Sequence, residues 1–294
     1  MHRCGYVAIV GRPNVGKSTL LNRILGQKIT ITSRKPQTTR HRILGIKTTP
    51  TVQAIYIDTP GLHRGVRHAI NRVMNRTATA AVADVDVVLF VVECLKWEEE
   101  DEHVLGLLAS ADVPVILVLN KVDRLKDKEQ LLPYIARMKE KRDFAAIVPV
   151  CATRGTQTEV LEEEVRRLLP ESPPFFPEEQ VTDRSERFLA AELVREKLTR
   201  LLGDELPYAV TVEIEEFKEG PELTTIGAVI WVERDAQKAI VIGRQGHMLK
   251  QIGTQARQEM ERLFGVKVYL QLWVKVKEKW SDDERALRSL GYGD

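Results

Sequence analysis

The chain has 294 residues, 43% of them hydrophobic and 29% charged, and its formal net charge is +2. This balance is typical of a protein with a packed core and excludes intrinsically disordered and fibrous classes. No stretch approaches the roughly 18 consecutive apolar residues of a membrane-spanning helix, and the first residues lack the apolar core of a signal peptide, so we expect a cytoplasmic protein.

Short apolar runs alternate with amphipathic stretches over residues 1–170. The runs cover residues 6–10, 52–57, 85–92, 113–119 and 145–150, and such runs are typical of strands buried on both faces of a parallel sheet. Residues 131–139 and 159–169 are patterned as helices. The alternation predicts a doubly wound α/β domain over residues 1–170.

Four prolines fall between residues 170 and 177, so we place a linker over residues 171–180. After it, the pattern predicts the element order α, β, β, α, α, β in a smaller α+β domain over residues 181–294. A capping box of Asp183 and Glu186 is expected to start its first helix. The later predicted elements are strands over 208–217, 225–233 and 266–277, a short segment over 237–242, and a helix over 248–264.

Three cysteines, Cys4, Cys94 and Cys151, are widely spaced along the chain. Their number is odd and their spacing matches no zinc-binding pattern. We therefore expect reduced, mainly structural thiols.

A glycine-rich loop lies between the first predicted strand and a helical run over residues 19–25. Its residues are Gly11, Arg12, Pro13, Asn14, Val15, Gly16, Lys17 and Ser18, followed by Thr19, and the first eight match the GxxxxGK[ST] phosphate-binding pattern. Backbone N–H groups of such a loop hold phosphate oxygens, Lys17 reaches the β and γ phosphates, and the Ser18 hydroxyl binds Mg²⁺. The loop predicts a magnesium-dependent nucleotide site.

The residues Asn120, Lys121, Val122 and Asp123 follow a buried strand at the end where α/β proteins bind ligands. They match NKxD, the guanine-reading pattern of the GTPase superfamily. Asp123 can accept hydrogen bonds from guanine N1–H and N2–H₂, whereas adenine would leave this carboxylate unpaired. Asn120 would tie neighbouring loops together and the Lys121 stem would cover the base, so we expect GTP and GDP as ligands.

The residues Asp58, Thr59, Pro60 and Gly61 form a DxxG motif at another strand end. Its carboxylate can hold Mg²⁺ through water, and the Gly61 amide can meet the γ-phosphate. A threonine before this motif would complete the Mg²⁺ shell, and we favour Thr39 over Thr38. The catalytic candidates are Lys17, Thr39, Asp58 and Gly61.

Cys151 and Ala152 stand after the last strand where GTPases usually have Ser-Ala-Lys, with the Ala152 backbone facing guanine O6. Position 62 is Leu where some GTPases have a glutamine that orients the attacking water. We therefore expect slow intrinsic hydrolysis, completed by another group, a bound cation or a partner. His63, Arg64, Arg67 and His68 could supply that group, although a solvated switch loop is the favoured interpretation.

A GxxG turn in the second domain predicts RNA binding. Glycines in such a turn let a phosphodiester backbone approach closely and clamp about four nucleotides. Residues 234–279 carry ten Lys or Arg and four Asp or Glu, whereas residues 204–222 carry seven acids and one Lys, so the domain is polarised as in a single-strand binder. Trp273 could stack on a base or pack in the protein. The candidate RNA contacts are Ile242, Gly243, Arg244, Gln245, Gly246, His247, Lys250, Lys275, Lys277 and Trp280, the last of which has the same two interpretations as Trp273.

These motifs together resemble the Era family of bacterial GTPases across essentially the whole chain. The likeness rests on the complete phosphate loop, the downstream NKxD, and Val-Ile-Gly-x-x-Gly in a domain whose element order resembles the type II KH fold, and it extends to residues 28–34, 58–63 and 282–292. The resemblance implies slow, Mg²⁺-dependent hydrolysis of GTP to GDP and phosphate.

The resemblance also implies partners. It implies that the KH domain binds single-stranded RNA near the 3′ end of 16S rRNA and that the protein assists assembly of the 30S ribosomal subunit. It further implies that K⁺ assists hydrolysis beside Asn14, that a hydrophobic residue replaces glutamine at Leu62, and that the protein associates peripherally with the inner face of the membrane. We expect a monomer. Two alternatives remain open, a constitutive RNA chaperone with a structural G domain and a peripheral membrane or cell-cycle switch.

Overall fold

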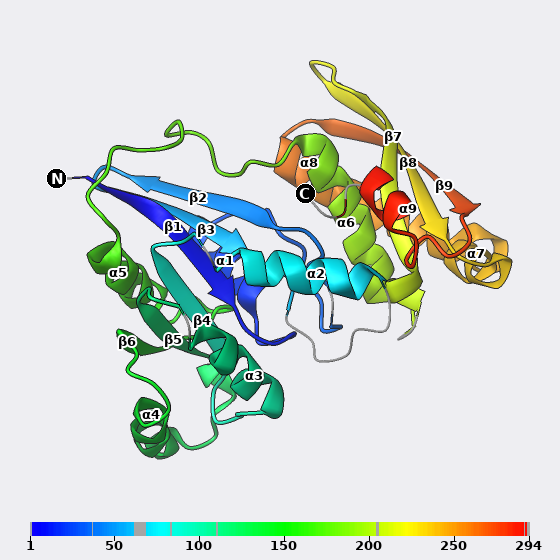
Figure 1. Cartoon of the computed structure of the whole chain (residues 1–294). Helices are drawn as coiled ribbons and strands as arrows, with labels where there is room; N and C mark the ends of the chain where they lie inside the picture. Colours follow the sequence, from blue (N-terminus) through cyan, green and yellow to red (C-terminus); the bar gives the residue numbers. More distant parts are fainter. Residues whose placement is uncertain are drawn as a thin grey trace. The chain divides into compact units, whose positions relative to one another are not determined.

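The computed structural model describes residues 2–36, 38–61, 69–82, 84–109, 111–203, 206–290 and 292 (Figure 1). The chain forms two compact units. Unit 1 comprises Met1–Thr30, Thr39–Val66 and Asn71–Asp183, and unit 2 comprises Ile31–Thr38, Arg67–Ile70 and Arg184–Asp294. Two short segments from the first part of the chain therefore belong to the C-terminal unit.

Unit 1 is built on a six-stranded sheet in the order β2-β3-β1-β4-β5-β6. The strands are β1 (Arg3–Val10), β2 (Ile43–Thr49), β3 (Val52–Asp58), β4 (Val87–Glu93), β5 (Val115–Asn120) and β6 (Ala146–Pro149). Every neighbouring pair is parallel except β2 with β3. The predicted apolar runs thus form the five parallel strands, as a doubly wound fold requires.

The antiparallel edge strand β2 was not predicted from the sequence. Gly45 lies in its middle, and glycine inside a strand weakens the local pattern. A Cβ atom at Gly45 would lie 2.7 Å from Leu25 Cδ1 and 2.8 Å from Leu21 Cδ1, because helix α1 packs closely against the strand there. The glycine is explained by this tertiary contact, which the sequence pattern does not contain.

Helices cover both faces of this sheet (Figure 1). Helices α1 (Lys17–Leu25) and α5 (Thr158–Leu168) contact each other and β3. Helices α2 (Ala69–Ala80), α3 (Glu99–Leu108) and α4 (Leu131–Lys139) share an apolar cluster with the other face, which includes Phe90 and Val92 of β4 together with Val104 and Met138. The predicted α/β class is confirmed. The colours of Figure 1 show how the chain alternates between strands and helices in unit 1.

The proline-rich segment runs along unit 1. Gln53, which is fully buried on β3, accepts hydrogen bonds from the backbone N–H groups of Phe175 (2.7 Å) and Phe176 (2.9 Å). Cys4 N–H donates to the Pro170 carbonyl at 3.1 Å, and Ile46 N–H donates to the carbonyl of residue 181 at 2.8 Å. Contacts place the end of unit 1 at Asp183, and the division into 1–170, 171–180 and 181–294 stays a prediction.

Unit 2 has a three-stranded sheet in the order β7-β8-β9. Its main elements are α6 (Glu186–Leu201), β7 (Val210–Lys218), β8 (Leu223–Val232), α7 (Asp235–Ile242), α8 (His247–Phe264), β9 (Lys267–Val276) and α9 (Glu284–Ser289). Strand β8 pairs antiparallel with β7 and parallel with β9. Helices α6 and α8 share an apolar core with the sheet. The predicted order α, β, β, α, α, β is confirmed.

The start of α6 differs from the sequence prediction. Ser185 is the N-cap, and its Oγ accepts from the Phe188 N–H at 3.3 Å. Asp183, the predicted cap, instead accepts from the Leu44 N–H of β2 at 3.1 Å. The carboxylate is used by the edge strand of unit 1, so the helix is capped two residues later.

The chain after β9 completes the core of unit 2. Trp280 is fully buried, its ring stacks on Tyr292 with centroids 6.1 Å apart, and its Nε1–H donates to the Ala209 carbonyl at 3.3 Å. The Tyr292 hydroxyl lies 2.8 Å from Thr211 Oγ1 on β7. Across the described ranges, no helix is long and apolar enough to cross a membrane.

Candidate functional site

The phosphate-binding loop joins β1 to α1 and adopts a backbone that needs glycine. Gly16 has φ 103°, and a Cβ there would lie 2.3 Å from Asn120 Nδ2. Asn14 has φ 64°, a left-handed conformation that asparagine tolerates better than most residues. Helix α1 begins at Lys17 directly after the loop, so its N-terminal amides can face an anion.

Lys17 is held inside this loop. Its Nζ donates to the carbonyl oxygens of Gly11 (2.9 Å) and Arg12 (3.0 Å), and the side chain is buried. Burial lowers the pKa of Lys17 to about 8, and the charge of Asp58 opposes this shift. The ammonium group is thus fixed at the loop where phosphate oxygens would lie.

Three oxygen-bearing side chains meet beside the loop. Ser18 Oγ donates to Asp58 Oδ2 at 2.7 Å and lies 2.8 Å from Thr39 Oγ1, which is 3.4 Å from Asp58 Oδ2. Asp58 is fully buried, and its Oδ1 has no hydrogen-bond partner among the described residues. Burial raises the pKa of Asp58 to about 6, against the effects of the Ser18 hydrogen bond and the Lys17 charge.

This cluster fits a hard divalent cation, because Mg²⁺ prefers hydroxyl and carboxylate oxygens. Thr38 points elsewhere: its Oγ1 lies 2.6 Å from Ser33 Oγ and donates to the Lys35 carbonyl at 2.8 Å. The geometry therefore favours Thr39 over Thr38 as the cation ligand.

Asn120 connects the loops around the expected base site. Its Nδ2 donates to the Val15 carbonyl at 2.8 Å, and its Oδ1 accepts from the Ala152 N–H at 3.1 Å. Lys121 Nζ donates to the Asn14 carbonyl at 2.6 Å and forms an ion pair with Glu93. Glu93 was not predicted, and its place at the end of β4 is the signal that could have found it.

Cys151, which stands where GTPases usually have serine, donates a hydrogen bond to Asp123. Its Sγ donates to Asp123 Oδ1 at 3.1 Å and lies 3.2 Å from Thr153 Oγ1. This hydrogen bond is the largest of the causes that hold the pKa of Asp123 below its usual value. The exposed carboxylate of Asp123 is thereby kept ionised, with Oδ1 hydrogen-bonded to the thiol.

Other residues of the predicted motifs support the loops. The Arg12 guanidinium pairs with Asp101 (3.0 Å) and Glu98 (3.4 Å) on and before α3, so only its backbone carbonyl meets Lys17. Thr59 Oγ1 donates to the Ile9 carbonyl at 2.9 Å. A Cβ at Gly61 would lie 2.8 Å from Pro13 Cγ, and Val15 and Pro60 are buried.

Several predicted positions are not covered by this geometry. Leu62 and the candidates His63, Arg64, Arg67 and His68 lie outside the described residues. Thr19, directly after the phosphate loop, and Val122, within NKxD, are half-buried.

Asp101 and Glu98 were not predicted from the sequence, because acidic residues at the start of a helix have an ordinary explanation in the helix dipole.

The two glycines of the GxxG turn are required for different reasons. Gly243 has φ 74°, and a Cβ there would lie 2.6 Å from Met248 Cβ. Gly246 has φ 77° at the N-cap of α8, and a Cβ there would meet no atom within 4 Å in the described part of the chain. Between and beside them, Arg244, Gln245 and His247 are exposed. The turn thus presents open backbone and a helix N-terminus.

The predicted RNA contacts separate into two groups. Ile242 to His247 form one turn, with Lys250 exposed on the first part of α8. Lys275 and Lys277 lie on and just after β9, with each ammonium 5.7 Å from the Trp231 ring centroid, and Lys275 also pairs with Glu215 at 2.8 Å. Trp280 is a correction: its buried ring is stacked on Tyr292 and cannot stack on a base.

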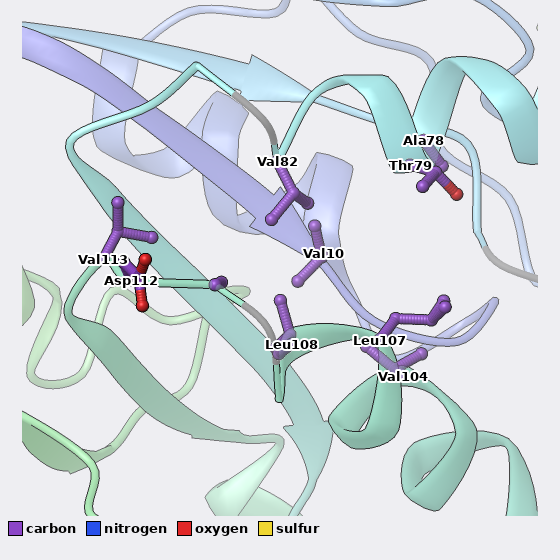
Figure 2. A pocket seen from close by; sticks show the side chains of 10 residues that line it. Val10, Ala78, Thr79, Val82, Val104, Leu107, Leu108, Asp112 and Val113 are labelled. Carbon is purple, nitrogen blue, oxygen red and sulfur yellow. The ribbon is translucent and has the colours of Figure 1, made fainter.

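A cavity of about 400 Å³ in unit 1 lies on the α2 and α3 side of the sheet, apart from these motifs (Figure 2). Apolar side chains such as Val10, Val82, Val104 and Leu108 point into it (Figure 2). Asp112 is the titratable residue among the described residues that line it. None of the described residues that line it belongs to the GxxxxGK[ST], DxxG or NKxD motif.

Comparisons with known proteins agree with this geometry. Residues 6–121 match the family described as "50S ribosome-binding GTPase", and residues 205–281 match the family described as "KH domain". The GTPase Era of Pseudomonas fluorescens is 61% identical over 292 residues, covering 99% of this chain and 97% of its own, and that of Pseudomonas aeruginosa is 61% identical over 99% and 96%.

Two solved structures are similar over nearly the whole chain. A crystal structure of Era with MgGDPNP and nucleotides 1506–1542 of 16S ribosomal RNA has a TM-score of 0.97 and 40% identity, covering 100% of both chains. A variant of Aquifex aeolicus Era bound to GDP.AlF4⁻ has a TM-score of 0.96 and 40% identity, covering 99% of this chain and 100% of its own. With the phosphate loop, the NKxD residues and the αββααβ unit in place, the chain belongs to the Era family of GTPases.

Proposed function

We propose that this protein binds and slowly hydrolyses GTP, and that its nucleotide state controls binding to the 3′ end of 16S rRNA during maturation of the 30S subunit. The observation that carries the nucleotide part is the convergence of Ser18, Thr39 and Asp58 beside the buried Lys17. A switch needs a ligand that contacts both a fixed loop and a movable one. Ser18 belongs to the fixed loop, and Thr39 belongs to the segment before DxxG.

Each nucleotide-site residue has a distinct proposed role. Residues Gly11 to Thr19 bind the phosphates, with Lys17 neutralising charge that develops on the β and γ phosphates. Ser18, Thr39 and Asp58 would hold Mg²⁺, which would supply positive charge to neutralise the phosphates. The Gly61 amide would contact the γ-phosphate. Asp123 would read guanine, with Asn120, Lys121, Cys151 and Ala152 shaping the base site.

The proposed slow intrinsic hydrolysis of GTP follows from position 62, where leucine has no group that could orient the attacking water. We propose that K⁺ bound beside Asn14 assists hydrolysis, and that RNA or the ribosomal subunit completes the site. The Asn14 carbonyl already accepts from Lys121, so the side chain rather than the carbonyl is the proposed K⁺ ligand.

The RNA partner is proposed from the GxxG turn and from a relative. An Era protein 40% identical over the full length was solved with nucleotides 1506–1542 of 16S ribosomal RNA. The matched GTPase family description names the 50S ribosome, but that match spans only residues 6–121, whereas the Era likeness spans the whole chain. We therefore propose the 30S subunit or its precursor, a monomeric protein, and a cytoplasmic location with peripheral membrane association.

The test of this proposal is RNA affinity in two nucleotide states. A fluorescent oligonucleotide with the 3′ sequence of 16S rRNA is titrated with protein saturated by GDPNP or by GDP, at one fixed salt concentration. We expect the two dissociation constants to differ by about fivefold or more, since linkage makes nucleotide and RNA binding reciprocal. Equal constants would refute the coupling.

Two variants separate the alternatives. A constitutive chaperone with a structural G domain predicts that Lys17→Ala leaves ribosome assembly unimpaired. A membrane or cell-cycle switch predicts binding to anionic vesicles that survives Gly246→Asp together with unimpaired function in the cell, whereas peripheral membrane association alone predicts only the vesicle binding. Our proposal predicts that Lys17→Ala impairs assembly and that Gly246→Asp loses RNA binding with GTP hydrolysis nearly intact.

A further inference from the structure

The segment Ile31–Thr38, which belongs to unit 2, is bound along helix α6 of the same unit. Thr32 N–H donates to Glu196 Oε1 at 2.9 Å, and the Arg200 guanidinium donates to the Thr32 carbonyl and Oγ1, both at 2.9 Å. At the other end of the segment, Arg195 Nη2 donates to the Thr38 carbonyl at 2.6 Å. The segment is thus held at both ends by one helix.

Arg195 is held rigidly for this contact. Its side chain is 2% exposed, and Nε and Nη2 donate to the two carboxylate oxygens of Glu192 at 2.7 and 2.6 Å. Such a two-point Arg–carboxylate pair fixes the plane of the guanidinium. Burying an ion pair has a desolvation cost that the attraction between its charges often only offsets. The Thr38 carbonyl gives the buried guanidinium a further hydrogen-bond partner.

Glu196 connects the segment to the helix that follows the GxxG turn. It is fully buried and pairs with Lys197 at 3.1 Å, and Lys197 also pairs with Glu259 on α8. Helix α8 begins at His247, directly after the turn. One run of charged contacts within unit 2 therefore leads from α8 to the backbone of Thr32.

We propose that Arg195 and Glu196 are positioning residues for Thr39, and that α6 thereby sets the geometry of the Mg²⁺ site. Thr39 is joined to Thr38 by a peptide bond, and consecutive Cα atoms are a fixed distance of about 3.8 Å apart. Releasing the Thr38 carbonyl therefore frees the Thr39 backbone, and with it the Oγ1 that lies beside Ser18 and Asp58. The inference rests on the proposed role of Thr39 as a Mg²⁺ ligand.

The test compares Arg195→Met with a control variant of a similar Arg–Glu pair on another helix. In Arg195→Met we expect the Mg²⁺ concentration for half-maximal single-turnover GTP hydrolysis to rise about tenfold, the effect of losing one hydrogen bond from a charged donor. GDP affinity should change by less than about twofold, because the threonine contact depends on the γ-phosphate. Arg195→Lys, which keeps the charge but not the planar fork, should fall between Arg195→Met and the wild type.

The control variant is Arg166→Met on α5. Arg166 pairs with Glu163 three residues earlier at 2.7 and 2.6 Å, the same spacing and geometry as Arg195 with Glu192, but the pair is exposed. We expect its Mg²⁺ dependence to equal that of the wild type. Both variants are first compared by thermal melting, so that loss of folding is separated from loss of positioning.

A second readout does not depend on hydrolysis. Amide hydrogen exchange of peptides covering residues 31–39 is measured in the GDPNP state, and Arg195→Met should exchange about tenfold faster there while residues 11–19 remain unchanged. The inference would be overturned if residues 31–39 of Arg195→Met exchanged at the wild-type rate, or if the Mg²⁺ dependence of its GTP hydrolysis were unchanged. If wild-type RNA affinity is the same in both nucleotide states, the proposed function fails instead, whatever Arg195→Met does.

Discussion

The two glycines of the GxxG turn predict different mutant phenotypes, a loss of stability at Gly243 and a loss of RNA affinity at Gly246. At Gly243, an alanine Cβ would lie 2.6 Å from Met248 Cβ and 3.0 Å from Met248 N. Overpacking of this kind costs about 1–3 kcal/mol. The backbone at φ 74° and ψ 174° lies in a region almost confined to glycine, which costs about 1–3 kcal/mol more. Gly243→Ala should therefore lose about 2–6 kcal/mol, a large part of the roughly 5–15 kcal/mol that stabilises a typical domain.

Gly246 has the αL conformation, with φ 77° and ψ 7°, and a Cβ there meets no atom within 4 Å in the described part of the chain. Gly246→Ala should lose only about 1–2 kcal/mol. Gly246→Asp should fold similarly, because aspartate tolerates this conformation, but its carboxylate would repel a phosphodiester at the N-terminus of α8. Its RNA affinity should fall by about a hundredfold or more.

The assay is urea unfolding followed by circular dichroism, together with RNA binding and GTP hydrolysis on the same preparations. Gly243→Ala should shift the unfolding midpoint clearly more than Gly246→Ala. Equal shifts would refute the packing argument at Gly243, and unchanged RNA affinity in a folded Gly246→Asp would refute the open-turn argument. Loss of GTP hydrolysis in either variant would indicate that the damage is not confined to the turn.

Three further predictions concern the nucleotide site. Asp123→Asn should move base preference from guanine to xanthine, since an amide donor pairs with the added xanthine carbonyl; competition between GDP and XDP measures this, and retained guanine preference would contradict it. Cys151→Ala should weaken GDP binding about threefold to tenfold and Cys151→Ser should restore it, by loss and return of one neutral donor to Asp123. Asp58→Asn should abolish hydrolysis yet stabilise the nucleotide-free protein by about 3 kcal/mol at about pH 7.5. Burial raises the pKa of Asp58 to about 6, so between about pH 6 and pH 4 the folded protein binds a proton that the unfolded protein does not. The stability gained by Asp58→Asn should therefore shrink as the pH falls through this window. A stability gain that does not depend on pH would contradict the raised pKa of Asp58.

Sequence reasoning succeeded where the signal is local. Continuous apolar runs identify the five parallel strands, of which β1, β3, β4 and β5 are largely buried on both faces. The strict alternation over 266–277 identifies β9, whose buried residues Val268 and Val274 face the core. The phosphate loop is equally local, because one backbone path must supply amides, a lysine and a hydroxyl within eight residues.

It failed where a residue is recruited by a distant part of the chain. Gly45 is explained by α1, and Asp183 is taken from the helix start by β2. Trp280 follows the last strand with no local pattern that marks it as a core residue, and it is buried against Tyr292, which lies further along the chain. Cys151 departs from the usual serine, and only its 3.1 Å contact with Asp123 reveals that the thiol keeps the hydrogen bond.

The most direct test of the account is GTP hydrolysis by the purified protein in Mg²⁺ and K⁺, with and without an oligonucleotide matching the 3′ end of 16S rRNA. We expect slow hydrolysis that the RNA accelerates, with the acceleration lost in Gly246→Asp. Tight RNA binding with unchanged hydrolysis would contradict it, because the nucleotide site and the GxxG turn would then act independently.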